Sequence, residues 1–237
     1  MNRSAAQQLG GTHRRPALRS AAPRAPALPS AVQPRRDSGL RRTVDVVAAA
    51  VGLVCAGPPL VVLAAAVRLT SPGPAIYRQD RVGRDGIPFS ILKLRTMVVG
   101  SDRGGPSVSG TADPRVTPLG RRLRAARLDE LPQLVNLLRG DMTLIGPRPE
   151  VPRFLEHYSP AERQLLRVRP GIIGPGALLF AHEQARELDA ADDPDLVYVA
   201  RHLHPKLAQD LDYVCHRTLS RDLSLLAAAA RMPLGGS

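Results

Sequence analysis

Residues 46–67 read VVAAAVGLVCAGPPLVVLAAAV and contain no charged side chain. Such a stretch satisfies the length test for a membrane helix, which needs about 20 residues to cross roughly 30 Å of hydrocarbon. Gly57-Pro58-Pro59 lies at its centre. A sharp break is predicted there, because proline lacks a backbone N–H and opposes a helical conformation of the residue before it. The arm from Thr43 to Gly57 would be about 22 Å long, which is too short to cross.

Arginines flank this apolar stretch on both sides. They are Arg41, Arg42, Arg68, Arg78, Arg81 and Arg84. The positive-inside rule therefore favours a cytoplasmic location for both ends. A re-entrant helix–break–helix over residues 43–70, which enters one leaflet and returns, satisfies both observations. Two alternatives stay open: a proline-kinked helix that spans the membrane, and a cleaved signal peptide with its small-residue site at residues 64–66.

The charge of the chain is unevenly distributed. The 237 residues have a formal charge of +12, and residues 1–42, with nine arginines and one acid, contribute +8 of it. This stretch is rich in Ala, Pro and Ser and shows no periodicity, so it is predicted to be a disordered basic tail. Anionic lipid or nucleic acid would attract such a charge. An Arg- and Ser-rich start is also typical of a transit peptide.

The cysteines and histidines indicate no metal site or disulfide framework. Cys55 and Cys215 are the only cysteines, too few for a framework and without zinc-site spacing. We therefore expect a reducing compartment. His182, His202 and His204 are not spaced as metal ligands, and we expect them at the surface or in the core.

Short strands between turns are predicted beyond residue 70. Asp85-Gly86 is a hairpin turn, and residues 89–97 are the strand that follows it. Side chains alternate along a strand, so Lys93 and Arg95 would share one face about 7 Å apart, with room for a phosphate between them. Lys93 is also one of only two lysines among 33 Lys and Arg residues. A solvated strand edge is the alternative.

Residues 100–127 contain a Gly- and Ser-rich loop followed by a basic amphipathic segment. The Gly- and Ser-rich loop over residues 100–114 is long enough to be a mobile lid or merely a slack connection. Leu119, Leu123 and Ala126 then recur at helical spacing, with Arg124 and other arginines around them. We favour a helix at a membrane interface, with its arginines toward lipid phosphates, over packing on an ordinary core.

The sequence LDELPQL, residues 128–134, places the carboxylates of Asp129 and Glu130 just before Pro132. Proline is tolerated in a first helical turn, so a helix is predicted to begin around Asp129. A helix start keeps a carboxylate ionised and favours a phosphate. One carboxylate can then attack phosphorus, while the other helps to bind Mg²⁺ against a diphosphate. Ordinary helix capping is the alternative.

Two further arginines are candidates for phosphate binding. Arg148 stands between Pro147 and Pro149, which stiffen its backbone, and Arg169 precedes the turn PGIIGPG. Guanidinium groups suit bidentate recognition of phosphate. The glycine-rich turn itself does not match a nucleotide-binding fingerprint.

Taken together, these segments resemble the bacterial sugar transferase family, the monotopic phosphoglycosyl transferases that begin the assembly of lipid-linked glycans. The resemblance covers about residues 40–228. It rests on RRTVDVV with the broken apolar stretch, LTSPGPAIYRQDRVGRDGIPFSILKLRTM, DPRVTPLGRRLRAARLDELPQLVNLLRGDMTLIGPRPE, RVRPGIIG and LDYVCHRTLSRDLSLL.

The resemblance implies an α+β fold: a small, mainly helical catalytic domain with short strands over residues 71–230. A re-entrant segment and interfacial amphipathic helices would hold this domain at the cytoplasmic face of the cell membrane. The implied reaction moves a sugar-1-phosphate from a UDP-sugar to polyprenyl (undecaprenyl) phosphate and releases UMP. Such a step initiates exopolysaccharide or glycoconjugate assembly.

The resemblance also assigns roles to particular residues. Asp129 would attack the sugar-bearing phosphate and hold the phosphosugar covalently, and Glu130 would help it to bind Mg²⁺. Arg124 and Arg148 fall where the family binds phosphate, and Lys93 and Arg95 match its KxRT segment.

The sequence leaves the sugar, an alternative function and the oligomeric state open. Ile173 stands where the family usually has threonine and Pro175-Gly176 follows it, so the sugar is not determined. The main alternative is a membrane-tethered basic protein that binds anionic lipid or nucleic acid without catalysis. An aromatic content of 3% disfavours nucleic acid. A degenerate member acting as a regulator is disfavoured by the intact Asp129-Glu130 pair, and a homo-oligomer is left open.

Overall fold

The computed structural model describes residue 34 and residues 37–232. In chain order its main elements are α1 (Gly39–Thr70), β1 (Ile76–Val82), β2 (Pro88–Leu94), α2 (Pro118–Ala125), α3 (Gln133–Arg139), β3 (Thr143–Ile145), β4 (Gly171–Ile173), α4 (Pro175–Asp189), α5 (Pro194–Val197), α6 (His204–His216) and α7 (Leu219–Arg231). Short 3₁₀ turns cover Arg84–Gly86, Leu128–Glu130, Pro152–His157 and Glu162–Arg167, and a π-helical turn covers Tyr198–Leu203. The expected α+β fold with short strands is confirmed. Most of the predicted tail lies outside the described residues.

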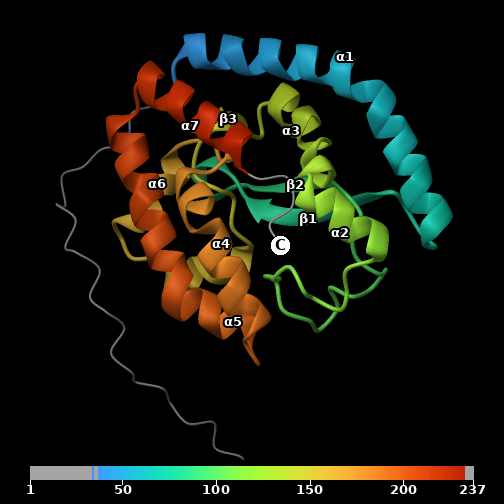
Figure 1. Ribbon diagram of the computed structural model, residues 1–237. Helices are drawn as coiled ribbons and strands as arrows, with labels where there is room; N and C mark the ends of the chain where they lie inside the picture. Colours follow the sequence, from blue (N-terminus) through green and yellow to red (C-terminus); the bar gives the residue numbers. More distant parts are fainter. Residues whose placement is uncertain (1–33, 35–36, 233–237) are drawn as a thin grey trace, which may run out of the picture.

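Helix α1 is the long apolar helix expected from the sequence. It begins at Gly39, inside the stretch assigned to the tail, because the Ser38 side chain caps it by accepting the Arg41 N–H. It runs without interruption through Pro58 and Pro59, and Figure 1 shows it bending about midway along the edge of the molecule. Proline is the usual cause of such a bend. The predicted break is therefore a bend within one helix.

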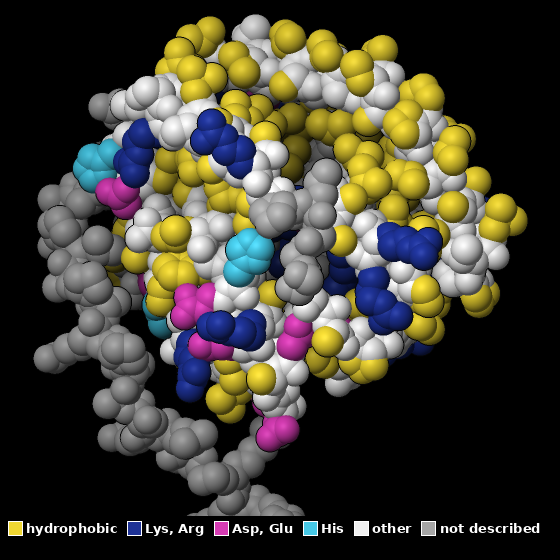
Figure 2. Space-filling view, viewed as in Figure 1, with side chains coloured by type: hydrophobic (Ala, Val, Ile, Leu, Met, Phe, Trp, Pro, Cys, Tyr) yellow, Lys and Arg dark blue, Asp and Glu magenta, His cyan; other side chains and the backbone are white. Residues whose placement is uncertain are grey.

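The outer side of α1 is apolar and exposed. Its exposed residues include Val44, Val47, Val51, Val54, Val61 and Val62, and hydrophobic side chains follow the rim of the molecule along this helix in Figure 2. In the described part of the chain, α1 is the one helix long and apolar enough to cross a membrane, judged by length and composition. An apolar surface of this extent marks an interaction surface.

Both ends of α1 contact the rest of the fold. Near its start, Arg42 donates hydrogen bonds of 2.7 Å to the carbonyl oxygens of Leu137 and Leu138, at the end of α3. One turn on, Asp45 is 3% exposed and accepts hydrogen bonds from Thr143 Oγ1 (3.1 Å) and the Leu144 N–H (2.9 Å). At the far end, the Arg95 guanidinium donates to the Ser71 carbonyl oxygen (2.8 Å) and Oγ (2.9 Å).

Two small sheets support the rest of the domain. Strands β1 and β2 pair antiparallel with Tyr77 opposite Lys93, and the predicted Asp85-Gly86 turn joins them, with Asp85 at φ 58°. Strands β3 and β4 pair in parallel. The larger hydrophobic core includes Phe154, Leu207 and other residues of the 3₁₀ turns, α4 and α6.

Helix α2 accounts for the amphipathic pattern of residues 119–126 in a different way from that expected. Its Leu123 is buried against Val67 of α1 and Leu94 of β2, and Leu119 packs on the same cluster. The apolar face of α2 is therefore covered by the protein itself. Leu119 and Leu123 pack on the core, and not on the membrane interface that was expected for this helix. Gly120 permits the close approach, since a Cβ there would lie 2.1 Å from the Thr96 carbonyl oxygen.

We predict that Asp45→Ala lowers the stability of the fold by about 2–4 kcal/mol, because it leaves buried donors without their acceptor. Val47→Ala, on the exposed side of the same helix, is the control and should change stability by less than about 0.5 kcal/mol. Thermal unfolding of the detergent-solubilised protein measures both. Equal melting temperatures for the two variants would contradict the role of Asp45.

Candidate active site

One cavity of about 830 Å³ lies between the β1–β2 hairpin, the loop after β2, α2 and α4. Lys and Arg dominate its charged lining, which consists of ten basic and three acidic residues. They are Arg78, Arg81, Lys93, Arg95, Arg103, Arg115, Arg124, Arg127, Arg148 and Lys206, with Asp102, Asp129 and Glu130. A cavity with this excess of positive charge suits a ligand that carries phosphate groups.

Asp129 lies in the cavity wall on the 3₁₀ turn Leu128–Glu130. The predicted helix begins only at Gln133, because Arg127 adopts a left-handed conformation (φ 54°) and redirects the chain after α2. Asp129 is 7% exposed, and among the described residues nothing donates a hydrogen bond to its carboxylate. Burial raises its pKa and the charge of Glu130 adds to the rise, while Lys93, Arg124 and Arg148 act in the opposite direction.

Glu130 is bound tightly, in contrast to its neighbour. Lys93 Nζ donates to Glu130 Oε1 at 2.9 Å, and the Arg148 guanidinium contacts both carboxylate oxygens, one of them at 3.2 Å. Burial alone would raise the pKa of Glu130, but the charges of Arg148 and Lys93 outweigh it and hold this pKa well below the ordinary value. Glu130 is therefore ionised, and both of its oxygens have partners.

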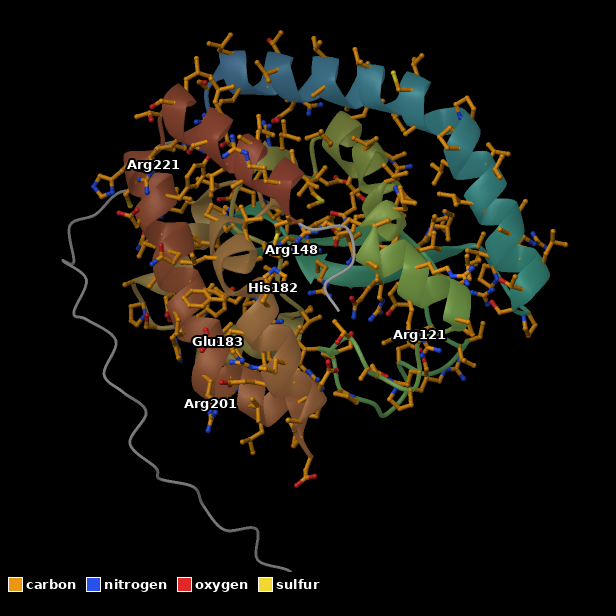
Figure 3. All side chains as sticks on the ribbon, viewed as in Figure 1. Arg121, Arg148, His182, Glu183, Arg201 and Arg221 are labelled. Atoms are coloured by element: carbon orange, nitrogen blue, oxygen red, sulfur yellow. The ribbon has the colours of Figure 1, made fainter. Side chains whose placement is uncertain are left out.

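Arg148 and Arg124 approach the two carboxylates from different elements. Arg148 follows β3, and its guanidinium is also anchored by the Ile172 carbonyl oxygen at 2.9 Å; Figure 3 shows it near the centre of the molecule, between α4 and α2. Arg124, on α2, donates to Thr96 Oγ1 (2.8 Å) and Ser109 Oγ (3.0 Å). Each guanidinium is thus held in one orientation before any ligand binds.

Two of the predicted phosphate ligands have other partners. Strand β2 ends at Leu94 rather than Met97, so the alternation expected to place Arg95 beside Lys93 stops, and Arg95 bonds to the end of α1. Arg95 still lines the cavity. Arg169 does not line it: the Arg169 guanidinium lies 3.8 Å from Asp37 and 3.9 Å from Asp45. Lys93 and Arg95 thus both line the cavity, but Lys93 is paired with Glu130 and Arg95 with the end of α1.

Several lining residues were missed by sequence reasoning. Arg81 stands on the same face of β1 as Tyr77 and donates to Gln79 Oε1 (3.0 Å) and the Pro149 carbonyl oxygen (3.1 Å). Lys206, the second lysine, is 6% exposed in the first turn of α6. The rarity of lysine in this chain could have identified Lys206 as a cavity residue, because both lysines line the cavity.

A buried aspartate also supports the site without lining it. Asp210 of α6 accepts hydrogen bonds from the Gly176 N–H (2.8 Å) and the Arg148 N–H (3.4 Å). Burial raises the pKa of Asp210 to about 7. This residue links the backbone of Arg148 to the start of α4.

Of the two carboxylates, Asp129 has oxygens that the described residues leave open to an ion such as Mg²⁺, whereas Lys93 and Arg148 occupy those of Glu130. Mg²⁺ takes oxygen ligands, and proteins usually supply one or two carboxylates while substrate phosphates and water complete the shell. Asp129 offers a carboxylate without a hydrogen-bond donor, next to Glu130. Within the described ranges no group of three or more His, Cys, Asp or Glu residues could hold a metal.

Comparison with known proteins identifies the family. The model of the bacterial sugar transferase family matches residues 36–235, and the chain belongs to that family.

Three relatives show how far the similarity extends. A UDP-glucose:undecaprenyl-phosphate glucose-1-phosphate transferase of Caulobacter vibrioides is 42% identical over 191 residues, 78% of this chain. A putative undecaprenyl-phosphate N-acetylgalactosaminyl 1-phosphate transferase of Bacillus subtilis is 46% identical over 119 residues, 50% of this chain. The exopolysaccharide production protein ExoY of Rhizobium meliloti is 39% identical over 149 residues, 56% of this chain. The matched part spans 66% of each relative's own length.

The contrast between the two carboxylates predicts opposite effects of neutral substitutions on stability. Asp129→Asn should leave the melting temperature unchanged or raise it, because burial disfavours the Asp129 charge. Glu130→Gln should cost about 2 kcal/mol or more, because Lys93 and Arg148 lose a charged partner. Asp85→Asn, an exposed position where asparagine tolerates the positive φ, is the matched control.

The effect of Glu130→Gln should also depend on pH. The folded-state pKa of Glu130 is depressed, so its contribution is complete above the unfolded value of about 4.3 and is lost as the pH falls below it. Thermal unfolding at pH 7 and at about pH 3.5 measures the difference between wild type and variant. A difference that grows toward acid pH would contradict the ion-pair assignment.

Proposed function

We propose that this protein is a membrane-attached enzyme that transfers a sugar-1-phosphate from a UDP-sugar to polyprenyl (undecaprenyl) phosphate and releases UMP. The observation that carries the proposal is Asp129, a buried carboxylate without a hydrogen-bond donor among the described residues, in a cavity where Lys93, Arg124 and Arg148 supply positive charge. The relatives named for undecaprenyl-phosphate sugar-phosphate transfer support the same reaction class. Their donors differ, so they leave the sugar open.

The proposed chemistry has two displacements at phosphorus. An Asp129 oxygen forms a bond to the sugar-bearing phosphorus, the bond from that phosphorus to the bridging oxygen breaks, and UMP leaves with the electron pair. The aspartyl phosphosugar is then attacked by an oxygen of polyprenyl phosphate, which regenerates the Asp129 carboxylate. Fixed cations stabilise the charge that develops in each step, since they need no reorganisation.

Glu130 and the cations have supporting roles in this scheme. Glu130 is unsuited to attack, because Lys93 and Arg148 occupy its oxygens; it orients these two cations toward the phosphate. When bound, Mg²⁺ would be held by Asp129 together with substrate phosphates, and it would neutralise part of their charge.

The membrane segment is proposed to be re-entrant, with the catalytic domain at the cytoplasmic face. Support comes from the two ends of α1, since Arg42 and Asp45 contact α3 and β3 while Ser71 bonds to Arg95. A straight spanning helix would separate these ends by the roughly 30 Å of hydrocarbon. The bend in Figure 1 instead returns the chain to the same domain. A place at the start of exopolysaccharide or glycoconjugate assembly fits the name of the Rhizobium meliloti relative.

We predict that membranes containing the protein release UMP from one or more members of a panel of UDP-sugars when polyprenyl phosphate is present. Asp129→Asn should lower this rate by about 10³-fold or more, because the nucleophile is lost. Asp85→Asn, the same chemical change at an exposed carboxylate, should keep the wild-type rate. Wild-type rates in a folded Asp129→Asn variant would refute the nucleophile, and no UMP from any donor would favour a binding protein.

For the topology, we predict that positions before and after α1 lie on the same side of the membrane. Ser38→Cys and Arg84→Cys, each in a background with Cys55 and Cys215 replaced by alanine, are treated with a membrane-impermeant maleimide. Both should be protected in intact cells and labelled after lysis. Labelling of only one of them in intact cells would indicate a spanning helix.

A further inference from the structure

Lys206 is a cavity residue that the proposed chemistry at Asp129 does not use. It is one of two lysines in the chain, and both line the cavity. The other lysine, Lys93, forms an ion pair with Glu130. The chain otherwise places arginine at its basic positions, and a lysine differs from arginine in presenting a compact charge with three donors.

The hydrogen bonding of Lys206 is incomplete. Its ammonium donates to the Tyr198 hydroxyl oxygen at 2.9 Å and lies 4.6 Å from the centroid of the same ring. Glu150 Oε1, which accepts a hydrogen bond from the Tyr198 hydroxyl, is 3.9 Å from Nζ, beyond hydrogen-bond distance. Among the described residues the ammonium thus has one acceptor for three donors. A buried charge in that condition is costly unless a ligand completes its shell.

The backbone around Lys206 is fixed. The π-helical turn Tyr198–Leu203 directly precedes α6, and such turns occur frequently at functional sites. Gly176 of α4 packs on the Lys206 carbonyl oxygen, which a Cβ at that position would approach to 2.3 Å. The lysine is therefore held at the cavity by α4 on one side and by Tyr198 on the other.

Lys206 belongs to a second group of charges in the cavity. It interacts electrostatically with Glu150, Asp210, Arg148 and Arg81, whereas Asp129 interacts with Lys93, Glu130, Arg124 and Arg148. Arg148 is common to both groups. Arg81 lines the cavity, and its guanidinium is oriented by Gln79 and the Pro149 carbonyl oxygen. Lys206, Arg81 and Arg148 carry three positive charges against the two acidic groups Glu150 and Asp210, so this group has a net positive charge for a ligand.

We propose that Lys206, with Arg81 beside it, forms a second anion subsite that binds a phosphate group other than the one being transferred. This inference rests on the proposed function, in which two ligands carry such a group: the nucleotide, through the phosphate that leaves in UMP, and polyprenyl phosphate. The shared chemistry is a phosphate monoester whose oxygens supply the acceptors that the Lys206 ammonium lacks.

The test compares UMP with uridine, which lacks the phosphate, by isothermal titration calorimetry on the full chain in detergent. Wild type should bind UMP at least tenfold more tightly than uridine. Lys206→Met, which keeps the length of the side chain without its charge, should weaken UMP binding about tenfold and leave uridine binding unchanged. Lys206→Arg, which keeps the charge, should retain most of the affinity. Thermal unfolding checks that both variants are folded.

A second arm distinguishes the two phosphates. The concentration of undecaprenyl phosphate needed for half-maximal transfer is measured for wild type and Lys206→Met. If Lys206→Met binds UMP normally but needs a higher concentration of undecaprenyl phosphate, the subsite binds the phosphate of the lipid acceptor. Unchanged UMP binding together with an unchanged lipid requirement would overturn the proposal. Failure of the proposed function is recognised separately, because calorimetry requires no turnover.

Discussion

Glu130 accepts hydrogen bonds from Lys93 and Arg148, and through them it connects strand β2, the 3₁₀ turn Leu128–Glu130 and the segment after β3. These elements are far apart in the sequence and meet at one carboxylate. A buried carboxylate is stable only with such partners, because an uncompensated charge in the interior is costly. The neighbouring Asp129 accepts no hydrogen bond from the described residues. One carboxylate therefore organises the site, and the other is the proposed nucleophile.

Helix α1 determines where the site would lie relative to the membrane in the proposed topology. An exposed apolar side of this size marks a protein or membrane interaction site. Its two ends return to one domain through Arg42, Asp45 and the Arg95–Ser71 contact, and Val67 near its end packs against α2, the helix that carries Arg124. The cavity is thus fixed relative to this apolar helix, the proposed membrane segment. Such an arrangement suits a reaction between an aqueous nucleotide sugar and a lipid phosphate.

The sequence predicted the parts of the site that depend on local pattern. The hairpin at Asp85-Gly86, the long apolar helix, the adjacent carboxylates and the stiff Arg148 segment were all readable from residue type and spacing. It failed where a contact between distant segments decides the outcome. Arg95 was assigned to phosphate, but the end of α1 offers unpaired carbonyl groups that its guanidinium satisfies. Arg169 likewise forms ion pairs with Asp37 and Asp45. The sequence around Arg95 and Arg169 contains no local pattern that predicts these partners.

The role of Asp129 as the nucleophile is tested most directly in the absence of acceptor. The purified wild-type protein is incubated with a UDP-sugar that it uses, without polyprenyl phosphate, and the released UMP and the intact protein mass are measured. We predict about one equivalent of UMP per protein and a mass increase equal to one phosphosugar, located on the peptide that contains Asp129. Release of UMP only when polyprenyl phosphate is added, or a phosphosugar on another residue, would contradict it.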